Sequence, residues 1–318
     1  MNRSYTTATR DTVRSVSEEC LRRYIGAFSV GGFMPGICDQ QTTCPGSNKI
    51  CSLKAGIASG REETHGMTVH IRRLSWAGVE INFNDRRLLI DTLQFSRPAL
   101  EKFMGRPHWP LVELEKTEGP TDALVTHIHH DHLDIEALRY LLGEEGSVYC
   151  HAPIVPHLRN NGLRAKEIEL WQSIRIAAGL TITAVPAVDW RGDDQVSWVV
   201  EVGEHRLFHG GDTIWHGSWW QIAHRFEEGF DWAFLPVNGV IVDLPGYAPS
   251  GIPATLTPHQ AVVATRLLRA RMLCPIHYGQ FNNPPFYVEQ PDIARDLQNL
   301  ALQEGVALEL YPDGAFVL

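Results

Sequence analysis

The sequence has 318 residues, of which 44% are hydrophobic and 20% charged, and its formal net charge at pH 7 is −9. This is an ordinary globular composition, and the length suffices for one large domain. The acidic balance argues against non-specific binding to nucleic acid, although a nuclease with a local basic patch stays open. No apolar run reaches the roughly 18–20 residues that span a bilayer, and no signal-peptide pattern is seen, so we expect a cytoplasmic protein.

Residues 1–66 differ from the rest because they show no sustained period of a helix or strand. They contain four of the six cysteines, and the spacing of Cys38, Cys44 and Cys51 is not that of a usual zinc site. We predict a poorly ordered extension that need not belong to the natural protein, with its cysteines as free thiols. Residues 67–318 show no linker, which predicts one domain.

From Met67 onwards the pattern becomes regular. Residues 69–74 and 79–83 alternate apolar with polar, as half-buried strands do, and residues 88–92 form a buried run that ends in Asp91 and Thr92. Residues 97–103 favour a short helix. The sequence thus predicts a β-meander that delivers a carboxylate to a strand end.

The stretch from Thr126 to His132 reads T-H-x-H-x-D-H. It follows a short buried run at residues 122–125 and precedes a segment with helical periodicity at residues 133–142. Its imidazoles and carboxylate therefore lie on a tight connection where several side chains can converge. Buried imidazoles need partners, so this pattern predicts a metal site rather than a solvated loop.

The second half continues with short strands and interspersed helices. Strands are predicted near residues 147–150, 173–176, 181–185, 196–202, 206–209, 232–236, 272–276, 307–311 and 315–318, and helices near 132–142, 219–226, 258–269 and 292–303. The third helix has clear start signals, because Thr257, Pro258 and Gln260 form a capping box with proline at the first position. The pattern predicts an α/β fold, an αββα sandwich of two mixed sheets flanked by helices.

Three further strand ends carry possible ligands. Asp189 follows the run at 181–185, Asp212 follows Gly210-Gly211, and His277 follows Pro275-Ile276. A strand delivers such residues to one edge of a sheet, where they can meet the 126–132 loop.

The order H-x-H-x-D-H, a ligand after a strand, G-D-T and then P-I-H-Y-G resembles the metallo-β-lactamase superfamily. The segments around Asp189-Trp190, LFHGGDT, LPVNG and PIHYGQF are most similar to its L-ascorbate 6-phosphate lactonase-like branch, which is related to the N-acyl-phosphatidylethanolamine phospholipase D type. The resemblance covers about residues 67–318.

The resemblance implies two divalent metal ions, zinc or manganese, with iron also compatible. One set of ligands is His127, His129 and a residue of the P-A-V-D-W segment; the other is Asp131, His132 and His277, with Asp212 bridging and Asp91 structural. The chain departs from the family at Asp189, where histidine is usual. An oxygen ligand there would favour harder ions over zinc.

In this scheme a metal-activated water attacks the substrate, Asp131 orients or deprotonates that water, and Asp212 bridges the ions. Candidate substrate contacts are Trp190, Arg191, His216, Asn238 and Tyr278. Gln280 and Tyr278 flank His277 and are candidate donors to an oxyanion. His130 and His209 are interpreted as structural or supporting residues, and Cys274 as a small buried apolar residue.

Three functions compete. The leading hypothesis is hydrolysis of a small ester or lactone, with or without a phosphate group. The second is a phosphodiesterase acting on nucleotides, RNA or a phospholipid head group, and the third is a metal-binding protein without catalysis. A small-molecule substrate is the expected partner, and assembly into a homo-oligomer is left open.

Overall fold

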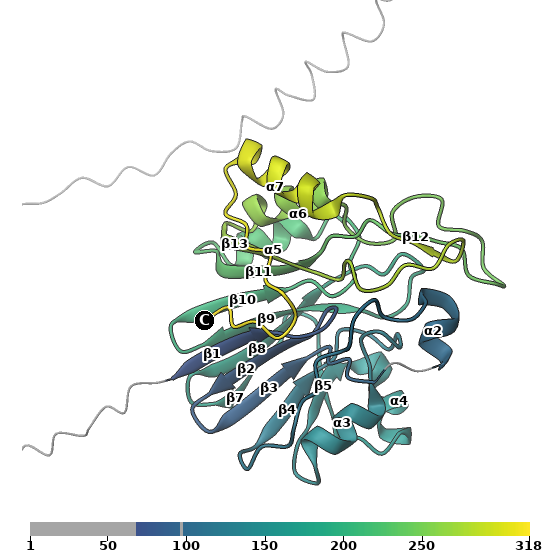
Figure 1. Cartoon of the computed structure of the whole chain (residues 1–318). Helices are drawn as coiled ribbons and strands as arrows, with labels where there is room; N and C mark the ends of the chain where they lie inside the picture. The colour runs from purple at the N-terminus through teal and green to yellow at the C-terminus, as the bar shows by residue number, and fades with distance from the viewer. Residues whose placement is uncertain (1–67, 96–97) are drawn as a thin grey trace, which may run out of the picture. The chain divides into compact units, whose positions relative to one another are not determined.

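The computed structural model describes residues 68–95 and 98–318, which form two six-stranded sheets packed face to face (Figure 1). In spatial order, the first sheet contains β1 (Val69–Arg73), β2 (Val79–Phe83), β3 (Arg86–Ile90), β4 (Thr121–Leu124), β5 (Val148–His151) and β6 (Ala165–Ile168). The second contains β13 (Ala270–Ile276), β11 (Phe230–Pro236), β10 (His205–His209), β9 (Val196–Val202), β8 (Leu180–Pro186) and β7 (Ser173–Ala177). A small third sheet pairs β12 (Ile241–Val242) with β14 (Tyr287–Val288).

Helices cover the outer face of each sheet, as Figure 1 shows. The first sheet carries α3 (Ile135–Leu142) and α4 (Val155–Asn160), the latter preceded by the 3₁₀ turn η1 (Ala152–Ile154). The second carries α5 (Trp219–Arg225), α6 (Pro258–Leu267) and α7 (Ile293–Glu304), while α2 (Pro98–Met104) lies at the side. This arrangement confirms the predicted αββα sandwich.

Three apolar clusters follow from this layering. The cluster between the sheets includes Ile71, Ile81 and Trp198, all fully buried. A second joins the outer face of the second sheet to its helices, and a third does the same beneath α3 and α4. Because strand side chains alternate between faces, each sheet can contribute to the central cluster and to one outer cluster.

Strand direction places the predicted ligands at one edge. β3 runs parallel to β4, and β10 runs parallel to β11 and β13. The loops that follow β4, β8, β10 and β13 therefore emerge at the carboxyl ends of strands and meet between the two sheets.

The strands predicted near residues 307–311 and 315–318 are wrong. Each segment pairs only briefly, with one bridge each, Leu308 to Leu273 and Phe316 to Arg72. Ala307 and Glu309 bond the backbone of Leu273, and residues 315–318 bond that of residues 71–73, but neither segment forms a regular strand.

The predicted helix at residues 132–142 begins three residues later than expected. Asp134 is its N-cap and accepts a hydrogen bond from the Ala137 N–H at 3.0 Å, while His132 N and Leu133 N donate to His129 O in a tight turn. The motif histidines thus precede the helix. Sequence analysis also missed β6, whose central Lys166 and Glu167 are both exposed, as well as α4 and the two-stranded sheet.

The predictions for residues 1–66 lie outside the described residues. Among the residues that are described, Cys150 and Cys274 are buried free thiols. No helix within 68–95 or 98–318 is long and apolar enough to cross a membrane.

The capping box of α6 allows a direct test of the sequence interpretation. Thr257 accepts from Gln260 N at 3.2 Å and its own N–H donates to Gln260 Oε1 at 3.0 Å. Thr257→Ala should lower the free energy of unfolding by about 1 kcal/mol in urea denaturation followed by circular dichroism. Ser218, the N-cap of α5, makes no side-chain capping bond, so Ser218→Ala is the matched control. Equal effects of the two changes would contradict the assigned role of Thr257.

Candidate metal centre

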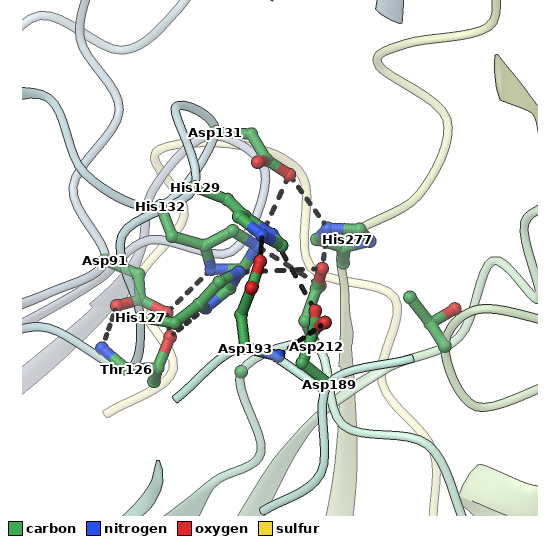
Figure 2. A network of polar contacts seen from close by, with 12 residues as sticks. Asp91, Thr126, His127, His129, Asp131, His132, Asp189, Asp193, Asp212 and His277 are labelled. Atoms are coloured by element: carbon green, nitrogen blue, oxygen red, sulfur yellow. Dashed lines mark hydrogen bonds and ion pairs between the residues drawn. The ribbon is translucent and has the colours of Figure 1, made fainter. Parts of the chain in front are cut away.

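The predicted ligands converge from four loops at the carboxyl ends of strands, as Figure 2 shows. The 126–132 loop follows β4, and Asp189, Asp212 and His277 follow β8, β10 and β13 respectively. Residues that are up to 150 positions apart in the sequence therefore share one small buried region.

The first tight group consists of Asp131, His132, Asp212 and His277, all buried. His277 Nε2 lies 2.7 Å from Asp212 Oδ1 and 3.2 Å from Asp131 Oδ2, and His132 Nε2 lies 3.1 Å from Asp212 Oδ1. Two imidazoles and two carboxylates thus face a common point, which is a donor set that suits a divalent cation.

The second tight group shares Asp212 with the first. It contains His127 and His129, and His127 Nε2 lies 3.9 Å from Asp212 Oδ2. Asp189 Oδ2 lies 3.8 Å from His129 Nδ1 and forms a separate close group with His129 and Asp193. One Asp212 oxygen therefore faces each group, as a bridging carboxylate requires.

The polar atoms of this cluster fit a cation better than they fit one another. In the part of the chain that the structure describes, His127 Nε2, His132 Nε2, Asp189 Oδ2 and Asp212 Oδ1 are buried and make no hydrogen bond of normal geometry. The contacts of Asp212 Oδ1 with the His132 and His277 rings are close ion-pair contacts only. Such atoms are costly to bury. A cation held between them would supply the missing interactions, so the residues present fit a divalent metal.

The protonation states are consistent with this role. Burial, together with the neighbouring His132 and His129, holds the pKa of His127 well below its usual range, so its imidazole is neutral. Burial alone would raise the pKa of the Asp131 and Asp212 carboxyls, but the adjacent histidines outweigh it and lower both. For Asp189, burial dominates and raises the pKa. Of these three carboxylates, Asp189 is therefore the one whose burial is least offset by neighbouring positive charge.

The nitrogen of each motif imidazole that faces away from the cluster is bonded. His132 Nδ1 lies 2.8 Å from Asp91 Oδ2, which also accepts from Thr126 Oγ1 at 2.6 Å. Thr126 Oγ1 lies 3.0 Å from His127 Nδ1 and accepts its proton. These bonds leave Nε2 of both rings as lone-pair donors toward the cluster. Asp91 is therefore a supporting residue, as predicted.

The loop that carries Asp212 depends on glycine. Gly211 has φ of 63°, and a Cβ there would lie 3.0 Å from the Thr126 side chain. Gln195, with its amide oriented to satisfy both groups, accepts from Asp212 N and Thr213 N at 3.1 Å. His209 bonds Ala77 O at 2.8 Å and is structural.

A pocket of about 420 Å³ opens onto the cluster. His129, Asp131 and Asp212 lie in its wall. The rest is mainly apolar or aromatic, with Ala99, Leu100, Phe103, Met104, Ile128, Val240, Val242, Leu244, Pro245, Ala254, Trp190, Tyr247 and Tyr287. Arg191 is the only lysine or arginine among the described lining residues.

The predicted substrate contacts have different locations. Trp190 and Arg191 line the pocket. His216 stacks on Trp219, with ring centroids 5.1 Å apart, and is not among the residues that line it. Tyr278 lies instead beside Arg73, whose guanidinium carbon is 5.6 Å from its ring.

The remaining predicted polar groups are committed to other bonds. Asn238 is fully buried; it donates to the Tyr287 hydroxyl at 2.9 Å and accepts from Thr255 at 2.6 Å. Gln280 accepts from Trp76 N at 3.1 Å and donates to Trp109 O at 3.3 Å, so its interpretation as an oxyanion donor is wrong.

Sequence analysis missed three residues of the site. Asp193 bonds His129, Trp76 Nε1 donates to Asp131 Oδ2 at 3.0 Å, and Tyr287 is one of the residues that line the pocket. Asp193 lies four residues after Asp189, so the sequence could have indicated it as a second carboxylate of that loop. Nothing in the sequence pattern marks Trp76 or Tyr287.

A family model described as the β-lactamase superfamily domain matches residues 86–278, more than half of the chain. The chain belongs to this superfamily. The resemblance to this superfamily that was predicted from the sequence is confirmed.

Two curated relatives of this β-lactamase superfamily member are informative. The mitochondrial N-acyl-phosphatidylethanolamine-hydrolyzing phospholipase D of Saccharomyces cerevisiae is 27% identical over 268 residues, which are 76% of this chain and 54% of that protein. This chain thus spans about half of that relative. A UPF0173 metal-dependent hydrolase of Thermus thermophilus is 26% identical over 256 residues, 76% of this chain and 99% of that protein.

Solved structures agree on the fold. The metallo hydrolase Igni18 of Ignicoccus hospitalis superposes with a TM-score of 0.58 at 20% identity, covering 78% of this chain and 97% of that one. This likeness confirms the superfamily fold.

Asp189 provides the sharpest test of the ligand set. Its Oδ1 accepts from Arg191 N at 2.7 Å and Asp193 N at 3.3 Å, so it also shapes the loop. Asp189→Asn keeps that acceptor but replaces the Oδ2 facing His129 with an amide, which is a poor metal ligand. Metal analysis by mass spectrometry should find about one equivalent less bound metal, while the melting temperature of the metal-free protein should match that of the metal-free parent. Unaltered metal content would mean that Asp189 only shapes the loop. Asp194→Asn, an exposed change in the same segment, is the control.

Proposed function

We propose that this chain is a two-metal hydrolase that cleaves a phosphodiester with an apolar substituent beside the scissile bond. The observation that carries this proposal is the position of Asp131 and Asp212 in the wall of a largely apolar pocket. The group to be cleaved would lie at the cluster, and its substituent against Leu100, Phe103 and Val242. The seven proposed ligands are those predicted from the sequence: His127, His129, Asp131, His132, Asp189, Asp212 and His277.

The character of the pocket supports an amphiphilic substrate. Apolar walls gain free energy by covering apolar surface, whereas a sugar or nucleotide would leave its hydroxyls or base edges without partners. The name of the yeast relative, a phospholipase D that hydrolyses N-acyl-phosphatidylethanolamine, agrees with a phosphodiester of this kind.

Two bound ions would lower the pKa of a coordinated water and polarise the phosphoryl oxygen under attack. The chain's own residues then hold and orient the reactants. Asp131 is fixed by Trp76 Nε1 on one side and faces His277 on the other, so its carboxylate has a defined position at the pocket wall. From there it can accept a proton from an attacking water.

Tyr287 is the best-placed proton donor in the pocket wall. Its hydroxyl oxygen accepts from Asn238 Nδ2 at 2.9 Å, and this leaves its proton free to donate. Burial, reinforced by Asp131 and Asp212, raises the pKa of Tyr287 well above its usual value, so the hydroxyl keeps that proton. We assign it the stabilisation of a developing oxyanion or leaving group. The predicted substrate contact Asn238 thereby acts through Tyr287.

The second candidate is an apolar carboxylic ester or lactone. Arg191 is the only lysine or arginine among the described lining residues, so little supports a small substrate that carries a separate phosphate group. An uncharged ester with an acyl or aryl group would fit the same walls. The two reactions share the metal-activated water and differ in the group attacked.

A substrate screen separates these possibilities. Metal-loaded protein should hydrolyse bis(p-nitrophenyl) phosphate faster than p-nitrophenyl butyrate or an aryl lactone. Turnover should disappear with a chelator and return with Mn²⁺ or Zn²⁺. His127→Ala should abolish it, whereas His224→Ala on the exposed face of α5 should not. Faster turnover of the ester or lactone would favour the second candidate, and no turnover together with no bound metal would favour a non-catalytic protein.

The role of Tyr287 predicts a separate effect. Tyr287→Phe should lower kcat by roughly 10²-fold, the usual cost of removing one oxyanion donor, with bound metal unchanged. Tyr247→Phe removes a hydroxyl from a 54% exposed ring of the same pocket and should leave kcat close to the parent value. Steady-state kinetics would give kcat for both variants, and metal analysis would give their bound metal. Similar kcat values for the two variants would show that the Tyr287 hydroxyl has no catalytic role.

A further inference from the structure

Asp193 contacts both His129 of the candidate metal centre and Arg191 of the pocket wall. Its Oδ2 lies 2.8 Å from His129 Nε2 and accepts from Arg191 Nε at 3.0 Å, and Arg191 Nη2 forms an ion pair with the same oxygen. Figure 2 shows Asp193 beside His129 and Asp189. The loop that presents these groups is shaped by Asp189 Oδ1, which accepts from the N–H groups of Arg191 and Asp193, and by Gly192, with φ of 87°.

Asp193 completes a pattern that the other two motif histidines show independently. His132 has Asp91 on its outward nitrogen, and His127 has Thr126. For His129 the outward nitrogen is Nε2, because Nδ1 is the atom that faces Asp189. Metal-binding histidines commonly donate their second N–H to a carboxylate, which fixes the ring and makes it a stronger ligand. Asp193 has the position of that carboxylate.

The hydrogen bond between His129 and Asp193 also determines which donors of Arg191 are available to a substrate. Arg191 Nη2 lies 3.0 Å from His129 Nε2. When Nδ1 offers its lone pair to a cation, Nε2 carries the ring proton and cannot accept from Arg191. Asp193 Oδ2 still accepts from His129 and from Arg191, which uses one Nη2 hydrogen. The second Nη2 hydrogen of Arg191, which faces His129, is left for another partner. Arg191 also lies over the ring of Tyr247, 4.9 Å from its centroid, and both residues line the pocket.

We infer that Asp193 is a positioning residue that orients both His129 and Arg191, and that Arg191 binds a negatively charged group of the substrate. This inference rests on the proposed hydrolase function and narrows its substrate class to anions with an apolar group. A guanidinium held by a carboxylate and an aromatic ring is pre-oriented, so it binds an anion without losing much side-chain freedom.

The positioning role is tested by metal affinity, which needs no turnover. Competition with a chromogenic chelator should show Mn²⁺ and Zn²⁺ binding about 10–100-fold weaker in Asp193→Ala than in the parent protein. Asp193→Glu should recover part of the loss, because a carboxylate is restored. Asp194→Asn, at the exposed neighbouring position, should match the parent. Parental affinity in a folded Asp193→Ala variant would overturn the positioning role.

The anion contact is tested by binding of hexyl phosphate to the metal-loaded protein, measured by calorimetry. Arg191→Gln should weaken this binding by about 10-fold or more while leaving metal affinity unchanged. Asp193→Ala should weaken both. Arg206→Gln removes a comparable half-buried ion pair, with Glu201, and is the control. Hexyl phosphate binding within about twofold of the parent in Arg191→Gln would overturn the anion contact.

A kinetic comparison separates this inference from the proposed function. Ethyl p-nitrophenyl phosphate is an anion, and diethyl p-nitrophenyl phosphate is its neutral counterpart with the same leaving group. Arg191→Gln should raise KM for the anion and leave KM for the neutral triester and kcat for both near the parent values. Hexyl phosphate binding that depends on Arg191, without turnover of any ester, would reject the hydrolase proposal and retain the anion site. Equal KM increases for both substrates would reject the anion contact.

Discussion

The position of Asp212 between two groups of imidazoles is the constraint on which the site depends. One carboxylate oxygen faces His132 and His277, and the other faces His127. The groups are largely buried, and several of their polar atoms make no hydrogen bond of normal geometry among the described residues. The histidines offset part of the cost of burying Asp131 and Asp212, but Asp189 is buried with less compensation and its pKa is raised. Burying charged groups in this way costs stability in a protein that holds nothing there. The fold therefore holds these histidine and aspartate side chains close together at a cost in stability, which bound cations would offset.

The surrounding structure supplies the rigidity that this geometry needs. Asp91 and Thr126 fix the outward nitrogens of two histidines, and Trp76 fixes Asp131. Gly211 lets the Asp212 loop approach Thr126 closely, which brings the ends of β4 and β10 together across the two sheets. The site thus depends on the sandwich, since the loop after β4 of the first sheet contributes four of the seven proposed ligands and loops of the second sheet contribute three. The central apolar cluster holds the two sheets together.

The residues that converge in the cluster could be predicted from the sequence, because histidine and aspartate at strand ends leave a local signature. The αββα order and the capping box of α6 were likewise readable from periodicity and from capping residues. Residues whose role depends on tertiary contacts could not be predicted in this way. Tyr287 lies on a two-residue strand, and Trp76 lies 55 positions before Asp131, to which it donates a hydrogen bond. Proximity in sequence was also misleading. Tyr278 adjoins His277 but packs beside Arg73, because successive side chains after a strand point in different directions.

The Asp189 loop shows how one substitution can change several properties of a site together. An imidazole at this position could not accept from the backbone of Arg191 and Asp193 as the aspartate does, so the loop that presents both residues depends on Asp189. The carboxylate also adds negative charge to a cluster that already contains Asp131 and Asp212. As a ligand, this carboxylate would offset more of the charge of the cations and would favour harder ions over zinc. A metal centre with a lower net positive charge attracts an anionic substrate less strongly. A cationic side chain in the pocket wall would then contribute more to binding that substrate. Arg191, two residues from Asp189, has the position to supply this positive charge.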